Sequence, residues 1–192
     1  MHFGAREISM GAVGNGLQVH GGFIPYVSTF LVFSDYARGS IRVAALSKMG
    51  VIWVLTHDSI AVGQDGPTHQ PIEHVMSLRL IPDLVVLRPG DANEVSEAWK
   101  YAVEHRDEEV ALILSRQNLP TFDRNVCKPA KGVAKGGYIL YETEEGTPDI
   151  ILMATGSELS LAYEASRKLE KQGRKVRVVS FPSWELFEKQ PK

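Results

Sequence analysis

The stretch Val51-Ile52-Trp53-Val54-Leu55 decides the fold, because an unbroken run of β-branched and apolar residues is typical of a strand buried on both faces. Helical patterns and further strands alternate with it along the chain. This alternation predicts an α/β fold, with a parallel sheet covered by helices on both faces. Thr56-His57-Asp58-Ser59 follows the run directly, so it is expected at the carboxyl end of the strand, where open parallel sheets bind ligands.

The remaining elements follow from the same periodicities. Glycines interrupt the first helical stretch, which indicates close packing against another surface, since a helical glycine otherwise costs about 1 kcal/mol. Asp91 is placed as the N-cap of a later helix. In chain order, the pattern predicts a helix over 8–20, a short strand within 23–33, a helix over 34–48, the strand over 51–55, a loop over 61–71, a helix over 72–79, a strand over 84–87, a helix over 91–104 and a strand over 110–114.

A domain boundary is expected where this periodicity lapses. Between 120 and 137, Pro, Gly, Lys and Asn dominate, which predicts a linker over 120–135 between a first domain over 1–119 and a second over 136–192. The second domain shows only one βαβ unit, part of a second α/β domain, with a strand over 149–154, a helix over 157–172 and a strand over 176–180. Both ends of the sequence suggest a piece of a longer chain.

Composition excludes several classes of protein. The 192 residues carry 21 Lys and Arg against 23 Asp and Glu, a formal net charge of −2, which gives no basic field for nucleic acid. The longest apolar runs are far shorter than the ~20 residues that a membrane span needs, so no membrane partner is expected. Cys127 is the only cysteine, which rules out an internal disulfide and favours a reducing compartment. The first residues lack the features of a signal peptide, so a cytoplasmic location is expected.

Two groups of candidate functional residues precede the strand over 51–55, and each group has two interpretations. Glu7 is either a first-turn carboxylate favoured by the helix dipole or a catalytic group. Phe30, Phe33 and Tyr36 lie three residues apart, so they form either one buried helical stripe or an aromatic platform for a cofactor.

Further candidates follow the strands. The loop over 57–71 holds two His and two Asp among Gly and Pro residues. A zinc site is disfavoured, because His57 and His69 are twelve residues apart with no thiolate, and no metal ligand is assigned in this chain. A loop that binds hydroxyl and phosphate groups fits better. Arg116, after the strand over 110–114, is either an anion clamp or part of a structural salt bridge.

Five motifs can be compared with known families as a set: His2-Phe3-Gly4-Ala5-Arg6-Glu7, Phe30-Leu31-Val32-Phe33-Ser34-Asp35-Tyr36-Ala37-Arg38, Thr56-His57-Asp58-Ser59, Asp65-Gly66-Pro67-Thr68-His69-Gln70-Pro71 and Leu114-Ser115-Arg116-Gln117-Asn118-Leu119. In order and spacing they resemble the transketolase family over the whole length of the chain. Related thiamine diphosphate enzymes, such as deoxyxylulose phosphate synthase and phosphoketolase, share the Glu and a Gly-Pro-Thr-His-type loop but not the third and fifth motifs.

The resemblance implies a thiamine diphosphate-binding pyrimidine-domain fold and reversible transfer of a two-carbon ketol group between sugar phosphates of the pentose phosphate pathway. Glu7 matches the catalytic glutamate that hydrogen-bonds the aminopyrimidine ring, a task that suits a buried carboxyl. Phe30, Phe33 and Tyr36 match the aromatic pocket around the pyrimidine, with Phe33 as the expected stacking partner. The four matches to sugar phosphate contacts are His57, Asp65, His69 and Arg116.

The resemblance also has gaps and alternatives. Gln64 stands where an acidic residue is expected. The family's diphosphate-binding domain, which carries the ligands for Mg²⁺ or Ca²⁺, has no counterpart in this sequence, so this piece alone is expected to be inactive. A homodimer with active sites at the subunit interface is expected. The alternatives are a neighbouring thiamine enzyme, or a non-catalytic transketolase-like partner that binds sugar phosphates without turnover.

Overall fold

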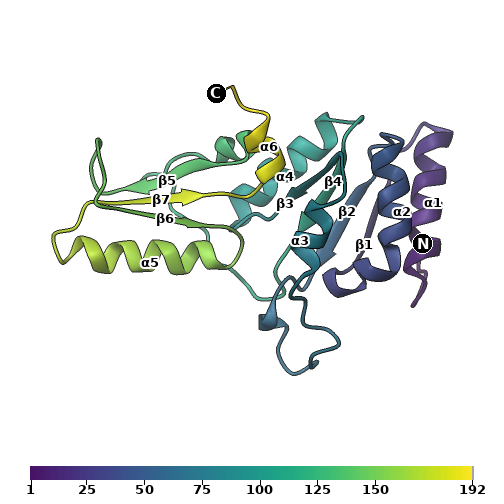
Figure 1. The fold of residues 1–192 in the computed structure, drawn as a ribbon, viewed down its shortest axis with the longest axis horizontal. Coiled ribbons are helices and arrows are strands. Elements are labelled where there is room, and N and C mark those ends of the chain that lie inside the picture. The colour runs from purple at the N-terminus through teal and green to yellow at the C-terminus, as the bar shows by residue number, and fades with distance from the viewer. Residues whose placement is uncertain (192) are drawn as a thin grey trace. The chain divides into compact units, whose positions relative to one another are not determined.

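The computed structural model describes residues 1–191 and divides the chain into two compact units. Unit 1 comprises residues 1–87 and 99–117, and unit 2 comprises residues 88–98 and the residues from Asn118 onward. Each unit has its own sheet (Figure 1). The helices and strands up to residue 117 are α1 (Glu7–His20), β1 (Tyr26–Phe30), α2 (Ser34–Leu46), β2 (Ile52–Thr56), α3 (His74–Arg79), β3 (Leu84–Leu87), α4 (Ala92–Glu104) and β4 (Glu109–Ile113), with short 3₁₀ turns at η1 (Leu31–Phe33) and η2 (Ile60–Val62).

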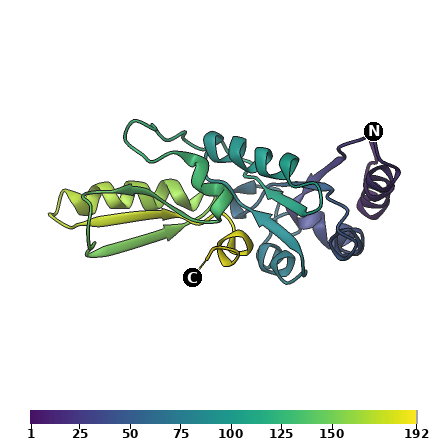
Figure 2. The same ribbon diagram turned by 90° about the horizontal axis from the view of Figure 1, so that it is seen from above.

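The sheet of unit 1 confirms the predicted parallel α/β fold. Its strand order is β1-β2-β4-β3, and every neighbouring pair is parallel. The crossover helices lie on both faces, with α2 and α3 on one side of the strands and α4 on the other (Figure 2). The predicted elements all exist, with ends that differ by a few residues from the sequence pattern.

Burial on both faces explains why the deciding stretch has no polar alternation. Successive side chains of a strand point to opposite faces. Val51, Trp53 and Leu55 therefore join one core cluster with Ile41 of α2 and Leu78 of α3. The two residues between them point to the opposite face and are also buried.

The glycines of α1 allow the close packing that the sequence indicates. A Cβ built on Gly11 would lie 2.6 Å from Cβ of Ser40 and 2.7 Å from the ring of Trp53. Gly21, with a φ of 83°, caps the carboxyl end of the helix, as expected. Helix α1 therefore lies against α2 at a distance that only glycine permits.

Unit 2 contains a strand that the sequence pattern missed. The missed strand is β5 (Tyr138–Glu142), which pairs antiparallel with β7 (Val176–Ser180). On its other side β7 pairs in parallel with β6 (Ile150–Ala154), so the strand order is β5-β7-β6. Asp91 is the predicted N-cap, since its Oδ1 accepts a hydrogen bond from the backbone N–H of Glu94 at 2.8 Å. The elements of this unit after residue 118 are η3 (Ala130–Lys135), β5 (Tyr138–Glu142), β6 (Ile150–Ala154), α5 (Glu158–Glu170), β7 (Val176–Ser180) and α6 (Trp184–Glu188).

The segment 120–135, predicted as a linker, is folded rather than extended. Phe122 and Cys127 are buried in the core of unit 2 with Leu140 and Leu159, and η3 follows them. The sequence pattern does not predict this packing, because Pro, Gly and Lys dominate the segment and its few apolar positions have no regular period. The domain boundaries placed at 119 and 135 stay a prediction.

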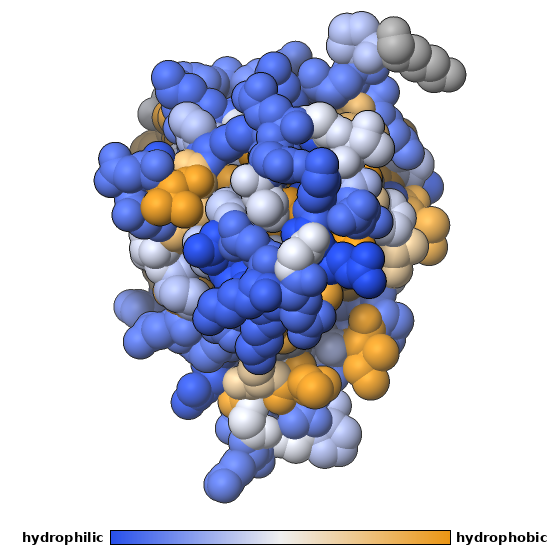
Figure 3. Space-filling model, turned by 90° about the vertical axis from the view of Figure 1, so that its left-hand side faces the viewer, coloured by the Kyte–Doolittle hydropathy of each residue, from blue (hydrophilic) through white to orange (hydrophobic). Residues whose placement is uncertain are grey.

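Polar residues cover most of one face of the molecule (Figure 3). The face shown in Figure 3 is mostly hydrophilic, with separate hydrophobic areas. Among the described residues, no helix is long and apolar enough to cross a membrane.

Candidate active site

The carboxyl ends of three neighbouring strands bring the sequence-predicted residues together. Phe30, the last residue of β1, pairs with Thr56, the last residue of β2. Next to it, the backbone N–H of Leu114 after β4 donates to the carbonyl oxygen of Leu55 at 2.9 Å. His57 and Arg116 therefore follow adjacent strands at the same edge of the sheet, where parallel sheets bind ligands.

A row of aromatic rings lies at this edge. The ring of Phe30 stacks on the imidazole of His57, with centroids 3.6 Å apart and planes 18° apart. On the other side, Phe33 lies nearly parallel to Phe30 at 6.0 Å, and Tyr36 continues the row at 6.0 Å from Phe33. The three residues come from β1, η1 and α2, and Tyr36 is 65% exposed. The buried-stripe interpretation is therefore wrong, since Phe30 and Phe33 are half-buried and Tyr36 is exposed.

The loop after β2 returns to the same rings. His69 lies edge-on to Phe33, with centroids 5.3 Å apart and planes 80° apart, and edge-on to Phe30 at 6.3 Å. Each imidazole is held at Nδ1 by its neighbouring threonine hydroxyl, Thr56 for His57 and Thr68 for His69, both at 2.9 Å. The other nitrogen of each ring, Nε2, is then the one that can meet a ligand.

The backbone of His57 is strained. Its φ is 62°, in the left-handed region that favours glycine. A non-glycine residue there costs of order 1–3 kcal/mol, and such conformations cluster at functional sites. This conformation accompanies the stacking of the imidazole on Phe30.

The surroundings of His57 favour the neutral form of its imidazole. Burial is the largest effect and lowers its pKa, and the guanidinium of Arg116 lowers it further, while the carboxylates of Asp65 and Asp58 act in the opposite direction. Arg116 is exposed and forms no salt bridge with a carboxylate of residues 1–191, which disfavours the structural salt bridge. The site therefore combines two imidazoles, the exposed guanidinium of Arg116 and the exposed carboxylate of Asp65.

Glu7 is the first residue of α1, where a carboxylate is favoured by the helix dipole. It is only half-buried in this chain, whereas the resemblance implies a buried carboxyl. The hydroxyl of Ser40 donates to the carbonyl oxygen of Ile8 at 3.0 Å. Ser40 lies one turn after Tyr36 and Ile8 directly follows Glu7, so the start of α1 lies beside the part of α2 that follows the aromatic row.

Sequence reasoning missed a polar group next to this site. Asp35, Glu73 and His74 place potential metal-ligating atoms within 4.8 Å of one another. His57 and His69 do not belong to that group. No sequence signal identifies it, because Asp35 and His74 are 39 residues apart and the motif that contains Asp35 does not indicate a partner near residue 74.

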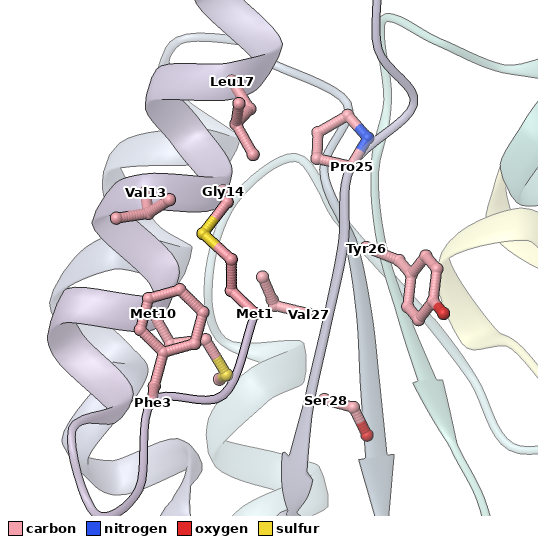
Figure 4. Close-up of a pocket in the computed structure, with 10 residues that line it drawn as sticks. All are labelled: Met1, Phe3, Met10, Val13, Gly14, Leu17, Pro25, Tyr26, Val27 and Ser28. Atoms are coloured by element: carbon pink, nitrogen blue, oxygen red, sulfur yellow. The ribbon is translucent and has the colours of Figure 1, made fainter.

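A cavity elsewhere in unit 1 does not contain the candidate residues. It measures about 350 Å³ and lies between α1 and β1, lined mainly by apolar side chains such as Met10, Leu17 and Val27 (Figure 4). None of its lining side chains is titratable apart from the hydroxyl of Tyr26. This cavity therefore holds none of the candidate residues.

Two family models match the chain. Residues 1–121 match the transketolase pyrimidine-binding domain, and residues 136–192 match the transketolase-like C-terminal domain.

Individual relatives give the same result. A transketolase of Geobacillus stearothermophilus is 52% identical over 190 residues, and a chloroplastic transketolase of Zea mays is 52% identical over 192 residues; each match covers 99% of this chain. A crystal structure of Pichia stipitis transketolase in complex with sedoheptulose-7-phosphate superposes with a TM-score of 0.89 at 46% identity and covers 97% of this chain and 27% of that one. The chain spans 28% of the length of the two curated relatives.

Proposed function

The chain belongs to the transketolase family, and we propose that it forms the pyrimidine-binding side of a thiamine diphosphate site at which a two-carbon ketol group passes between sugar phosphates. The observation that carries this proposal is the meeting of Phe30, Phe33, His57 and His69 at one sheet edge. Aromatic rings can pack against a heteroaromatic cofactor, and imidazoles can form hydrogen bonds with a polyhydroxylated substrate.

The residues present fit the cofactor. The row of partly exposed rings offers flat apolar faces to an aminopyrimidine, with Phe33 as the proposed stacking partner. Glu7 would accept or share a proton with a ring nitrogen of that pyrimidine. When bound, thiamine diphosphate supplies the carbanion chemistry, and the protein orients the reactants.

The polar residues fit a sugar phosphate. Arg116 presents the paired N–H donors that suit a terminal phosphate. His57 and His69 would form hydrogen bonds with sugar hydroxyls through Nε2, since Nδ1 of each ring already contacts a threonine hydroxyl. Asp65 would accept a hydrogen bond from a hydroxyl near the reacting carbon.

Parts of the proposed enzyme lie outside these residues. The ion that binds the diphosphate, Mg²⁺ or Ca²⁺, would be held by other parts of the protein, since the candidate site offers no ligand set for it. We also propose a homodimer with the active site at the subunit interface, a cytoplasmic location and a role in the pentose phosphate pathway.

A chimeric enzyme tests the proposal. Residues 1–192 replace the matching stretch of the G. stearothermophilus transketolase, and ketol transfer is measured with thiamine diphosphate and magnesium. We expect transfer from ketose phosphates to aldose phosphates, and about a tenfold higher KM in Arg116→Gln with a smaller change in kcat. Glu104→Gln, an exposed change at the end of α4, is the control and should leave both constants unchanged.

Other results would contradict the proposal. A folded chimera that binds sugar phosphates without turnover would support a non-catalytic binding module. Activity with the donor and acceptor pair of deoxyxylulose phosphate synthase, and not with that of transketolase, would assign the chain to that neighbouring reaction.

A further inference from the structure

Two helices that flank the aromatic row are joined by polar side chains. Helix α2 begins directly after Phe33, and α3 begins five residues after His69. The contacts between the two helices come from Asp35 and Arg38 on α2 and from His74 and Ser77 on α3, a set that we call the α2–α3 clamp. None of these residues belongs to the catalytic or binding groups proposed above.

The first contact of the clamp joins a buried ring to an exposed carboxylate. Nε2 of His74 lies 3.1 Å from Oδ2 of Asp35. The side chain of His74 is 6% exposed and that of Asp35 is 56% exposed. Because Asp35 lies between Phe33 and Tyr36 in the chain, this contact fixes the turn that carries both rings.

The second contact lies one helical turn further along each helix. Nη1 of Arg38 donates to Oγ of Ser77 at 3.0 Å, and Nη2 donates to its carbonyl oxygen at 2.8 Å. The Ser77 hydroxyl in turn donates to the carbonyl oxygen of His74 at 2.9 Å. Positions three apart lie on one face of a helix, so the two contacts define a single register between α2 and α3.

Apolar packing supports the clamp. Ala37 and Ile41 of α2 and Leu78 of α3 are fully buried in the same core cluster. Packing alone tolerates small shifts of one helix along the other, whereas a bidentate guanidinium contact fixes position and direction. The polar pairs therefore supply the precision that the apolar contact lacks.

We propose that His74 and Arg38 are positioning residues, which hold the loop that carries His69 against the ring of Phe33. The inference rests on the proposed function, since it assigns to the clamp the alignment of the sugar-binding imidazole with the cofactor platform. His69 and Phe33 lie only five and two residues from the members of the first contact, so a shift of α3 relative to α2 changes the 5.3 Å ring contact directly.

The first test needs no activity. In the 192-residue chain, NMR measures the nuclear Overhauser effect between the rings of His69 and Phe33, and hydrogen exchange measures the amides of residues 63–72. We expect His74→Ala and Arg38→Ala to lose the ring contact and to exchange this loop about tenfold faster, the effect of losing one or two hydrogen bonds. His74→Gln keeps a side-chain N–H donor and should retain both signals.

Glu73→Gln is the matched control. The Glu73 carboxylate lies 3.9 Å from Nδ1 of His74 and is 73% exposed, so its charge should not position the ring. An unchanged ring contact in both alanine variants would overturn the inference, as would a His74→Gln variant as perturbed as His74→Ala. If His74→Ala fails to fold, Arg38→Ala and His74→Gln still decide the outcome.

The second test uses the chimeric enzyme. We expect His74→Ala to raise the KM for the sugar phosphate about tenfold while kcat changes less than about threefold. Asp35→Ala should have the same effect, and the double variant should equal either single variant, because both remove one contact. Additive effects of the two substitutions on KM would contradict the inference. An inactive wild-type chimera would instead count against the proposed function, and the NMR experiment alone would then test the α2–α3 clamp.

Discussion

Replacing Glu109 by glutamine tests how a buried carboxylate joins the central strands of unit 1. Glu109 begins β4 and is 0% exposed. Its Oε2 accepts hydrogen bonds from the backbone N–H groups of Gly50 at 3.0 Å and Val51 at 3.1 Å, and its Oε1 accepts one from the indole of Trp53. Burial raises its pKa to about 7, although these donors and the charge of Arg106 oppose the rise.

The raised pKa predicts the direction of a pH effect on stability. A folded pKa of about 7 against an ordinary value of 4.5 means that the folded chain holds a proton which the unfolded chain releases. Stability from this group is therefore fully present below about pH 4.5 and is lost as the pH rises through about 7. Linkage between these two values gives a loss of roughly 2–3 kcal/mol between pH 5 and pH 8.

Urea unfolding at the two pH values measures this loss. The wild-type chain should lose roughly 2–3 kcal/mol more than Glu109→Gln, which has no titrating group at this position. At pH 5 the variant should be less stable by about 1–3 kcal/mol, because its amide N–H₂ faces donors that need an acceptor. The indole N–H resonance of Trp53 should titrate near pH 7 in the wild type alone. Glu104→Gln serves as the exposed control.

A single result would refute this reasoning. If Glu109→Gln shows the same pH dependence as the wild type, the buried carboxylate does not control the slope, and the cause lies with other titrating groups. An indole resonance of Trp53 that does not move between pH 5 and pH 8 would also show that Glu109 does not titrate in this range.

Two further predictions concern packing and charge. Gly11→Ala should destabilise unit 1 by about 1–3 kcal/mol, because its Cβ would meet neighbours at 2.6–2.7 Å, whereas Gly16→Ala, with nothing within 4 Å, should stabilise it by about 0.5–1 kcal/mol. Urea unfolding distinguishes the two, and equal effects would contradict the packing argument. Arg116→Gln should raise the pKa of His57 and Asp65→Asn should lower it, as imidazole NMR titration can show. Shifts of the same sign would mean that these charges do not act on His57.

The helices and strands of unit 1 are predicted well from the sequence, because burial requires recognisable patterns of apolar residues. A strand covered on both faces must be apolar throughout, as Val51 to Leu55 is. Parallel pairing then places Phe30, His57 and Arg116 at one edge without further information. The meeting of the aromatic and histidine motifs follows from topology alone.

Other features depend on contacts between distant residues. Nothing in the sequence shows that His57 adopts a positive φ and stacks on Phe30, because glycine is the usual signal for that backbone. Glu109 is a charged residue, so the strand was expected to begin at Val110, yet three donors allow Glu109 to be fully buried. The antiparallel strand β5 was not predicted from the sequence, because its partner, β7, is more than thirty residues away.

The most direct measurement of the central claim is ketol transfer by the chimeric enzyme in which Glu7 is changed to glutamine. The change keeps the size of the side chain and removes its ability to take up a proton. If Glu7 acts on the cofactor, kcat/KM should fall by about 10²–10⁴-fold, while the fold and the affinity for sugar phosphates are retained. Transfer within about twofold of the unmodified chimera would contradict the claim that Glu7 acts on the cofactor of a thiamine diphosphate site in this chain.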